Sequence, residues 1–335
     1  MQLVRGEAGA MPEIGGLEAY WRHHTRRERR AADADMWMTD GILLDALGLG
    51  IEQTQSYLAR ATPDYEEFKR WILDTAGPPD AERVARYRAW RDGAPPPPRT
   101  RARILAVEAA PDVLGPEEMS GWERDGYVIL HAAIAAGEAA AAAEALWDHL
   151  GAAPDDPASW YKPNSHGIMV QLFQHPALEP ARRSERIHKA FAQLWGTADL
   201  WSTTDRMSFN PPETEHHSFQ GPHLHWDVSL ATPIPFATQG ILYLTDTAAD
   251  QGALILVPGF HRRIEAWLES LPAGADPRRQ DLSGEARAIP AGAGDLVIWR
   301  NALPHGASPN RSARPRMAHY VNMYSPALKR QKVWR

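Results

Sequence analysis

The stretch Gln220-Gly221-Pro222-His223-Leu224-His225-Trp226-Asp227 decides how the rest of this 335-residue chain is interpreted. It begins with a Gly-Pro turn signal and ends in a His-x-Asp triplet, so we expect a short extended segment. In extended backbone, residues i and i+2 share a face, which points His225 and Asp227 into one space and Trp226 away from it. That geometry suits a metal site. The chain has fourteen histidines, and on the order of one such triplet is expected by chance, so its context must decide.

Short apolar runs follow the triplet and indicate a fold built mainly from β-strands. Residues 239–246 and 293–300 have the length and composition of buried strands. Residues 252–261 form another such run, which ends in a Pro-Gly turn, and residues 316–324 supply the last strand. The triplet therefore lies in a region of short strands and turns.

A second histidine, His305, and an arginine, Arg316, follow the triplet. Two imidazoles and a carboxylate can hold Fe(II) on one face, and a guanidinium beside them can pair with an anionic oxo acid. A metal-dependent hydrolase or isomerase on a cupin-like barrel would also use histidines and a carboxylate, but it would not need this arginine. A non-catalytic barrel that binds a ligand is the third alternative.

The order of these motifs resembles that of the phytanoyl-CoA dioxygenase family of Fe(II)/2-oxoglutarate oxygenases. The resemblance covers residues 122–326 and begins with residues 122–130, which contain Asp-Gly-Tyr and look like the family's opening strand. The other motifs then follow in the family's order, namely the His225 triplet, the Val-Pro-Gly-x-His segment in residues 252–261, Gly294-Asp295, His305-Gly306 and Arg316.

The resemblance implies a mainly β protein with flanking helices (α+β), whose core is a cupin-like double-stranded β-helix, or jelly roll. In it, His225, Asp227 and His305 would bind Fe(II), and Arg316 would pair with the distal carboxylate of 2-oxoglutarate. The implied enzyme is an Fe(II)/2-oxoglutarate-dependent dioxygenase that also consumes O2 and releases succinate and CO2.

The implied reaction is hydroxylation of an unactivated C–H bond in a small-molecule substrate, such as a natural product, an amino-acid derivative or an acyl compound. Halogenating relatives carry alanine or glycine at the position of Asp227, so halogenation is not expected. Desaturation, cyclisation and epimerisation begin with the same hydrogen abstraction and stay open.

Other residues are candidates for the cosubstrate and substrate sides of the site. Some family members have a serine two residues after the distal histidine. This chain has Ala307 there, so the adjacent Ser308 is the candidate substitute, and Gln239 is a second candidate contact for the cosubstrate. Candidates for the substrate side, each with packing or structural support as its alternative, are His223, Trp299, Tyr320, Asn322 and Arg206.

The domain organisation is expected to change near residue 100. Spaced apolar and aromatic residues predict short helices within residues 17–35, 40–60 and 63–75, and the run Pro95-Pro96-Pro97-Pro98 predicts a stiff spacer. We therefore expect a helical N-terminal region, residues 1–100, and an oxygenase domain, residues 101–335. The helices would pack on the core, cover its pocket or form a homodimer contact.

Composition restricts the partners of the protein. There are 36 basic and 42 acidic residues, a net charge of −6, which argues against a general nucleic-acid binder. The chain has no cysteine, so disulfides and thiolate metal sites are excluded. The sequence has neither a long apolar run nor the apolar core of a secretory signal, so we expect a cytoplasmic protein without a membrane partner.

Overall fold

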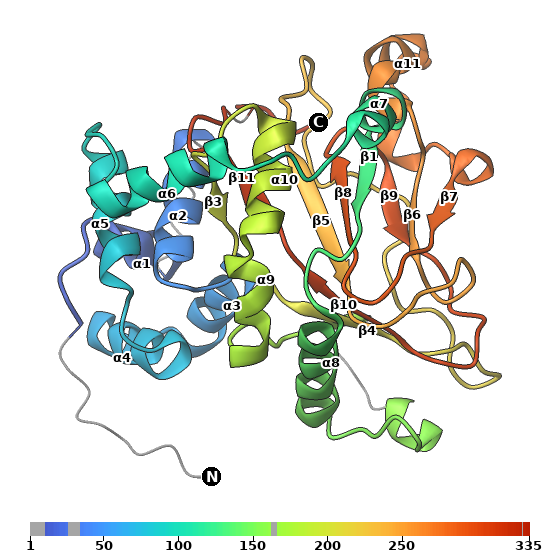
Figure 1. Cartoon of the computed structure of the whole chain (residues 1–335), viewed down its shortest axis with the longest axis horizontal. Helices are drawn as coiled ribbons and strands as arrows, with labels where there is room; N and C mark the ends of the chain where they lie inside the picture. The colour runs from blue at the N-terminus through green and yellow to red at the C-terminus, as the bar shows by residue number, and fades with distance from the viewer. Residues whose placement is uncertain (1–10, 26–33, 162–165, 330) are drawn as a thin grey trace. The chain divides into compact units, whose positions relative to one another are not determined.

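The first unit of the chain, Met1–Ala106, consists of helices in its described part (Figure 1). The computed structural model describes residues 11–25, 34–161, 166–329 and 331–335. The second unit is Val107–Arg335, and the predicted division at residue 100 stays a prediction. The helices of the first unit are α1 (Leu17–Thr25), α2 (Ala34–Ala46), α3 (Ile51–Ala61), α4 (Tyr65–Ala76), α5 (Ala81–Arg91) and α6 (Pro98–Ala109), the last of which continues into the second unit.

Local capping explains where several of these helices begin. The side chain of Asp64 accepts a hydrogen bond from the Glu67 amide at the start of α4, and Asp80 does the same for the amide of Arg83 in α5. Pro98 is the first residue of α6, a position that proline favours because its missing N–H is not needed there. The predicted proline spacer is therefore wrong for Pro98.

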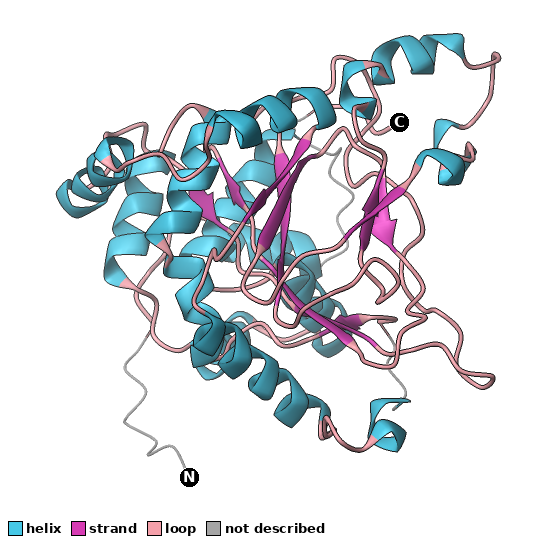
Figure 2. Ribbon diagram, turned by 45° about the vertical axis from the view of Figure 1, so that its right-hand side comes forward, coloured by secondary structure: helices cyan, strands magenta, loops and turns pink. Residues whose placement is uncertain are grey.

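Antiparallel sheets form the centre of the second unit (Figure 2). A six-stranded sheet has the order β1 (Tyr127–Leu130), β8 (Leu296–Arg300), β5 (Thr238–Tyr243), β10 (Arg316–Tyr320), β4 (Met207–Asn210) and β2 (Met169–Val170). A three-stranded sheet has the order β7 (Arg287–Ile289), β6 (Leu254–Leu256) and β9 (His305–Ala307), and a small pair joins β11 (Met323–Tyr324) to β3 (Trp201–Ser202). The predicted fold class, an α+β protein with a cupin-like jelly-roll core, is confirmed.

The opening motif has a different structure from the predicted one. Trp122 lies in helix α7 (Pro116–Asp125), and strand β1 begins only at Tyr127. Gly126 ends the helix with a φ of 79°, a left-handed conformation that glycine adopts readily. The other α-helices of this unit are α8 (Ala136–Leu150), α9 (Glu179–Arg183), α10 (Glu185–Trp195) and α11 (Ile264–Ser270), and the short 3-10 helices are η1 (Pro157–Tyr161), η2 (Pro176–Leu178), η3 (Phe260–Arg262), η4 (Pro277–Arg279) and η5 (Ser283–Glu285).

The six-stranded sheet is apolar on both faces because its strands alternate between two clusters. Leu296 and Ile298 of β8 pack with Leu146 of α8 and Phe191 of α10, which cover one face. Residues of opposite phase, such as Val297, pack with the strands of the three-stranded sheet. This second face carries the site described below. Among the described residues, no helix combines the length and the apolar character that crossing a membrane requires.

Candidate metal centre and cosubstrate pocket

His225 and His305 face each other across an isolated β-bridge. The amide of each donates to the carbonyl of the other, with N···O distances of 2.9 and 3.0 Å. Their imidazole centroids lie 4.6 Å apart. The bridge therefore brings together two side chains that are 80 residues apart in the sequence.

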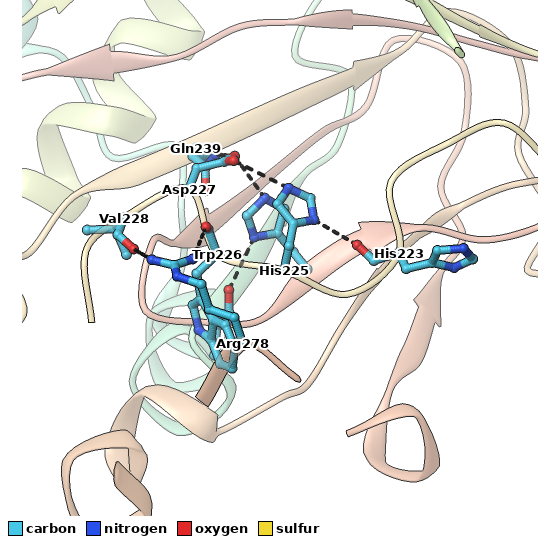
Figure 3. Close-up of polar contacts among 9 residues, drawn as sticks. His223, His225, Trp226, Asp227, Val228, Gln239 and Arg278 are labelled. Atoms are coloured by element: carbon cyan, nitrogen blue, oxygen red, sulfur yellow. Dashed lines mark hydrogen bonds and ion pairs between the residues drawn. The ribbon is translucent and has the colours of Figure 1, made fainter. Parts of the chain in front are cut away.

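Asp227 completes the group (Figure 3). Its Oδ1 lies 3.3 Å from Nε2 of His225, and its Oδ2 lies 3.3 Å from Nε2 of His305. The donor atoms of the three residues all lie within 4.8 Å of one another. Gln239 of β5 holds the carboxylate from the side, because its Nε2 donates to Oδ2 over 2.7 Å. Two nitrogens and a carboxylate oxygen thus converge on one point.

The other nitrogen of each imidazole is fixed by the backbone. Nδ1 of His225 lies 2.7 Å from the carbonyl oxygen of His223, and Nδ1 of His305 lies 3.2 Å from that of Leu303. A carbonyl can only accept, so each Nδ1 donates its hydrogen to the backbone and each Nε2 is left to face Asp227, where it would bind a metal after it gives up its proton. Metal-bound histidines are commonly oriented in this way. The three residues therefore fit an Fe(II) site of the two-histidine, one-carboxylate kind.

Charge is balanced within the group. Partial burial would raise the pKa of Asp227, but hydrogen bonds to His225 and His305 outweigh it and place that pKa below its ordinary value. Burial would lower the pKa of His225, yet its hydrogen bond to Asp227 raises it. Asp227 is thus an anion, as a metal ligand must be.

A cavity of about 210 Å³ lies between the two sheets at this point. Besides the three residues, the six-stranded sheet contributes Gln239 and Trp299 to its wall and the three-stranded sheet contributes Leu254. Arg316 of β10 also lines the cavity, although only 1% of this residue is exposed to solvent. The candidate metal-binding group and the buried arginine thus share one cavity.

Arg316 is held in place by two hydrogen bonds. Its Nε donates to the carbonyl oxygen of Gly252 over 3.0 Å, and its Nη1 donates to Oγ of Ser208 over 2.6 Å. Ser208 lies on β4, which pairs with β10. These bonds fix the plane of the guanidinium against the cavity, so it is preorganised for a carboxylate.

Ser308, the predicted substitute for the missing serine, has another structural role. Its Oγ donates to the carbonyl of Ala253, and the residue does not line the cavity. In β9 the neighbouring Ala307 faces the cavity instead, because successive residues of a strand point to opposite sides. The prediction for Ser308 is therefore wrong. Ser208 supplies the hydroxyl beside Arg316, which only the pairing of β4 with β10 could have indicated.

The remaining candidates differ in their placement. His223, a substrate-side candidate, does not line the cavity: its ring is exposed and points away from the group in Figure 3, and its carbonyl oxygen supports His225. Gln239 contacts Asp227, as described above. The other four substrate-side candidates all line the cavity, namely Arg206, Trp299, Tyr320 and Asn322.

Comparison with known proteins identifies the family. Residues 110–318, more than half of the chain, match the family described as Phytanoyl-CoA dioxygenase (PhyH). The chain belongs to this family. The predicted family and enzyme class are confirmed, and the protein is a non-haem dioxygenase dependent on Fe(II) and 2-oxoglutarate.

Two curated relatives illustrate the similarity. A putative phytanoyl-CoA dioxygenase from Dictyostelium discoideum is 29% identical over 92 residues, which are 26% of this chain and 26% of that protein. The match thus spans about a quarter of that relative. An ectoine dioxygenase from Bordetella parapertussis is 24% identical over 239 residues, which are 61% of this chain and 73% of that protein.

Solved structures show a weaker likeness. EctD from S. alaskensis in its apoform is 18% identical and has a TM-score of 0.48, over 67% of this chain and 82% of that chain. AviO1 from Streptomyces viridochromogenes Tue57 is also 18% identical, with a TM-score of 0.47, over 65% of this chain and 98% of that chain. Because both scores lie below 0.5, the family assignment rests on the sequence match alone.

Proposed function

We propose that this dioxygenase hydroxylates an unactivated C–H bond of a small-molecule substrate. One oxygen atom of O2 enters the substrate as a hydroxyl group and the other enters succinate, which forms together with CO2 from 2-oxoglutarate. A natural product, an amino-acid derivative or an acyl compound is the proposed substrate class. Ectoine dioxygenases among the relatives support a small-molecule substrate.

The single observation that carries the proposal is the convergence of His225, Asp227 and His305 in the cavity that Arg316 also lines. The three residues would hold Fe(II) on one face and leave its other positions open to ligands. Bound Fe(II), with 2-oxoglutarate and O2, supplies the oxidising power for the C–H bond. The histidines are ready to bind because their Nδ1 hydrogens already point at carbonyls.

Arg316 would bind the distal carboxylate of 2-oxoglutarate. The interior of the protein strengthens such a pair because water does not compete for the guanidinium. Ser208 and the Gly252 carbonyl keep the guanidinium from rotating, so little side-chain freedom is lost when the carboxylate binds. The distance from Arg316 to the metal group would then select the chain length of the keto acid.

The other walls of the cavity would position the substrate. Trp299 packs against His305 with a centroid distance of 5.1 Å and gives the wall an apolar surface. Arg206, Tyr320 and Asn322 give it polar groups. A mixed wall of this kind suits a small molecule that has both an apolar body and polar substituents.

The predicted homodimer stays a prediction. Light scattering of the purified protein would test it.

An anaerobic titration tests the proposal. Metal-free protein is mixed with Fe(II) and 2-oxoglutarate, and the visible charge-transfer band of the chelated keto acid is recorded. We expect a band in the wild type and a weaker one in both Arg316→Ala and Asp227→Ala. A metal-loaded wild type without a band would overturn the proposal. A positive result leads to a substrate screen by succinate release and mass spectrometry, in which a gain of one oxygen atom is expected.

A further inference from the structure

The segment that carries Asp227 is not part of a sheet. The structure describes every residue between β4 and β5, residues 211–237, and none of them belongs to a strand. His225 is anchored by its bridge to His305, but the bridge ends there. The backbone that follows therefore needs another support if Asp227 is to stay in place.

Arg278, on the 3-10 helix η4, provides that support (Figure 3). Its Nη1 donates to the carbonyl oxygen of Trp226 over 2.7 Å, and its Nη2 donates to that of Val228 over 2.6 Å. These two residues flank Asp227 directly. One planar guanidinium thus fixes the peptide group between Trp226 and Asp227 and the peptide group that follows Val228, so it holds the backbone on either side of Asp227.

The position of Arg278 is itself fixed from its own side. Asp276 caps η4, because its carboxylate accepts from the Arg278 amide over 2.9 Å. Nη2 of Arg278 also donates to the carbonyl of Arg335 over 3.0 Å, and the guanidinium lies 4.8 Å from the ring centroid of Trp334. The contacts thus extend from the capped turn η4 through Arg278 to the segment on either side of Asp227.

The last residues of the chain reinforce the same segment. Oγ of Ser229 donates to the carbonyl of Val333 and accepts from the amide of Arg335, at 2.7 and 3.0 Å. The amide of Leu230 donates to the carbonyl of Arg335 over 3.1 Å. Arg278 and residues 333–335 therefore hold the two ends of one short run, residues 226–230, in place of a neighbouring strand.

We propose that Arg278 is a positioning residue for Asp227 and, through it, for the metal. This inference rests on the proposed function of the three ligands. Arg278 does not line the cavity and would touch neither the metal nor the substrate. Its role needs the guanidinium fork, since an ammonium group is a point donor that does not match two carbonyls at once. Loss of a residue that orients a metal ligand typically lowers metal affinity by about 10- to 100-fold.

Binding of Co(II) to the metal-free, full-length protein tests the proposal without any turnover. The affinity is measured by calorimetry, and the visible absorption of bound Co(II) reports its ligand geometry. For Arg278→Gln we expect a dissociation constant about 10- to 100-fold above that of the wild type and a changed spectrum. For Arg278→Lys we expect an intermediate affinity, because one of the two hydrogen bonds can be restored.

Arg279→Gln is the matched control. Arg279 is on the same turn, its side chain is 86% exposed, and its ion pair is with Asp276. Denaturant unfolding of each metal-free variant shows whether a change in Co(II) affinity is accompanied by a loss of stability. If Arg278→Gln does not fold, the affinity of Arg278→Lys tests the proposal instead. Equal affinities in the Arg278 and Arg279 variants would overturn only the role of Arg278. A wild type that binds no Co(II) would overturn the metal site and this inference together.

Discussion

A guanidinium that is fixed in its plane binds a carboxylate in two parallel hydrogen bonds, which an ammonium group cannot do. Arg316 is buried and already hydrogen-bonded to Gly252 and Ser208. For Arg316→Lys we expect the KM for 2-oxoglutarate to rise at least about tenfold, since a hydrogen bond to a charged group contributes about 1.5–3 kcal/mol. Steady-state succinate release measures it. An unchanged KM would show that another residue binds the distal carboxylate.

Ser208 and Ser308 can be compared to find which serine supports the binding of 2-oxoglutarate. Ser208 accepts a hydrogen bond from Arg316, whereas Ser308 donates to Ala253 outside the cavity. We expect Ser208→Ala to raise the KM for 2-oxoglutarate by about 2- to 10-fold, because Arg316 loses one of the two hydrogen bonds that fix its plane. Ser308→Ala should leave it unchanged. The reverse result would return Ser308 to its predicted place at the cosubstrate.

Strand β9 must approach the metal-bearing segment closely, and Gly306 permits this. A Cβ added to Gly306 would lie 2.6 Å from the carbonyl oxygen of His223, the one that accepts from His225, and 2.9 Å from that of Pro222. We expect Gly306→Ala to separate β9 from residues 222–225, to cost about 1–3 kcal/mol of unfolding free energy, and to weaken metal binding. Denaturant unfolding and Co(II) titration measure these effects.

Gly284 provides the control for Gly306→Ala. An added Cβ at Gly284 would meet no atom within 4 Å. Gly284→Ala should therefore leave both the stability and the metal affinity close to those of the wild type. If Gly306→Ala behaved like this control, the backbone of residues 222–225 would be freer to move than the contacts indicate.

Sequence patterns predicted the strands of this protein better than the segments between them. The run at residues 239–246 became β5 (Thr238–Tyr243), because alternation and β-branched or aromatic residues reflect burial on a sheet. The grouping of His225, Asp227 and His305 was also predictable, because iron favours these residue types and the family resemblance supplied their order, whereas their binding of Fe(II) stays a proposal. The support of Asp227 by Arg278 was not predicted, because it is a side-chain contact to carbonyls 50 and 52 residues away.

In the second unit, the six-stranded sheet separates a layer that contains the cavity from a layer of packed side chains on its other face. The face toward the three-stranded sheet carries the cavity, with Arg316 and Tyr320 of β10 in its wall. His319, one of the two residues of opposite phase between them, points to the other face and is 0% exposed. A titratable side chain thus lies behind the site in an apolar layer, where it affects stability rather than chemistry.

His319 makes the stability of the metal-free protein depend on pH in a defined direction. Burial, and then the positive charge of Arg182, hold the pKa of His319 well below 6.5. Arg182 stays nearby because it donates to the carbonyls of Phe173 and Asp205. Since the unfolded chain binds the proton more readily, the contribution is fully present above about pH 6.5 and is lost as the pH falls below that value.

We expect this one group to reduce the unfolding free energy by about 1.4 kcal/mol for each pH unit below its unfolded pKa. His149 and His261 act in the same direction because burial also lowers their pKa values, whereas the raised pKa of His225 acts against them. Denaturant unfolding of metal-free His319→Gln between about pH 5 and 8 isolates the contribution of His319. The variant should have a shallower slope on the acidic side than the wild type. Equal slopes would mean that His319 is protonated in the folded protein, and that the layer behind the sheet tolerates a second positive charge beside Arg182.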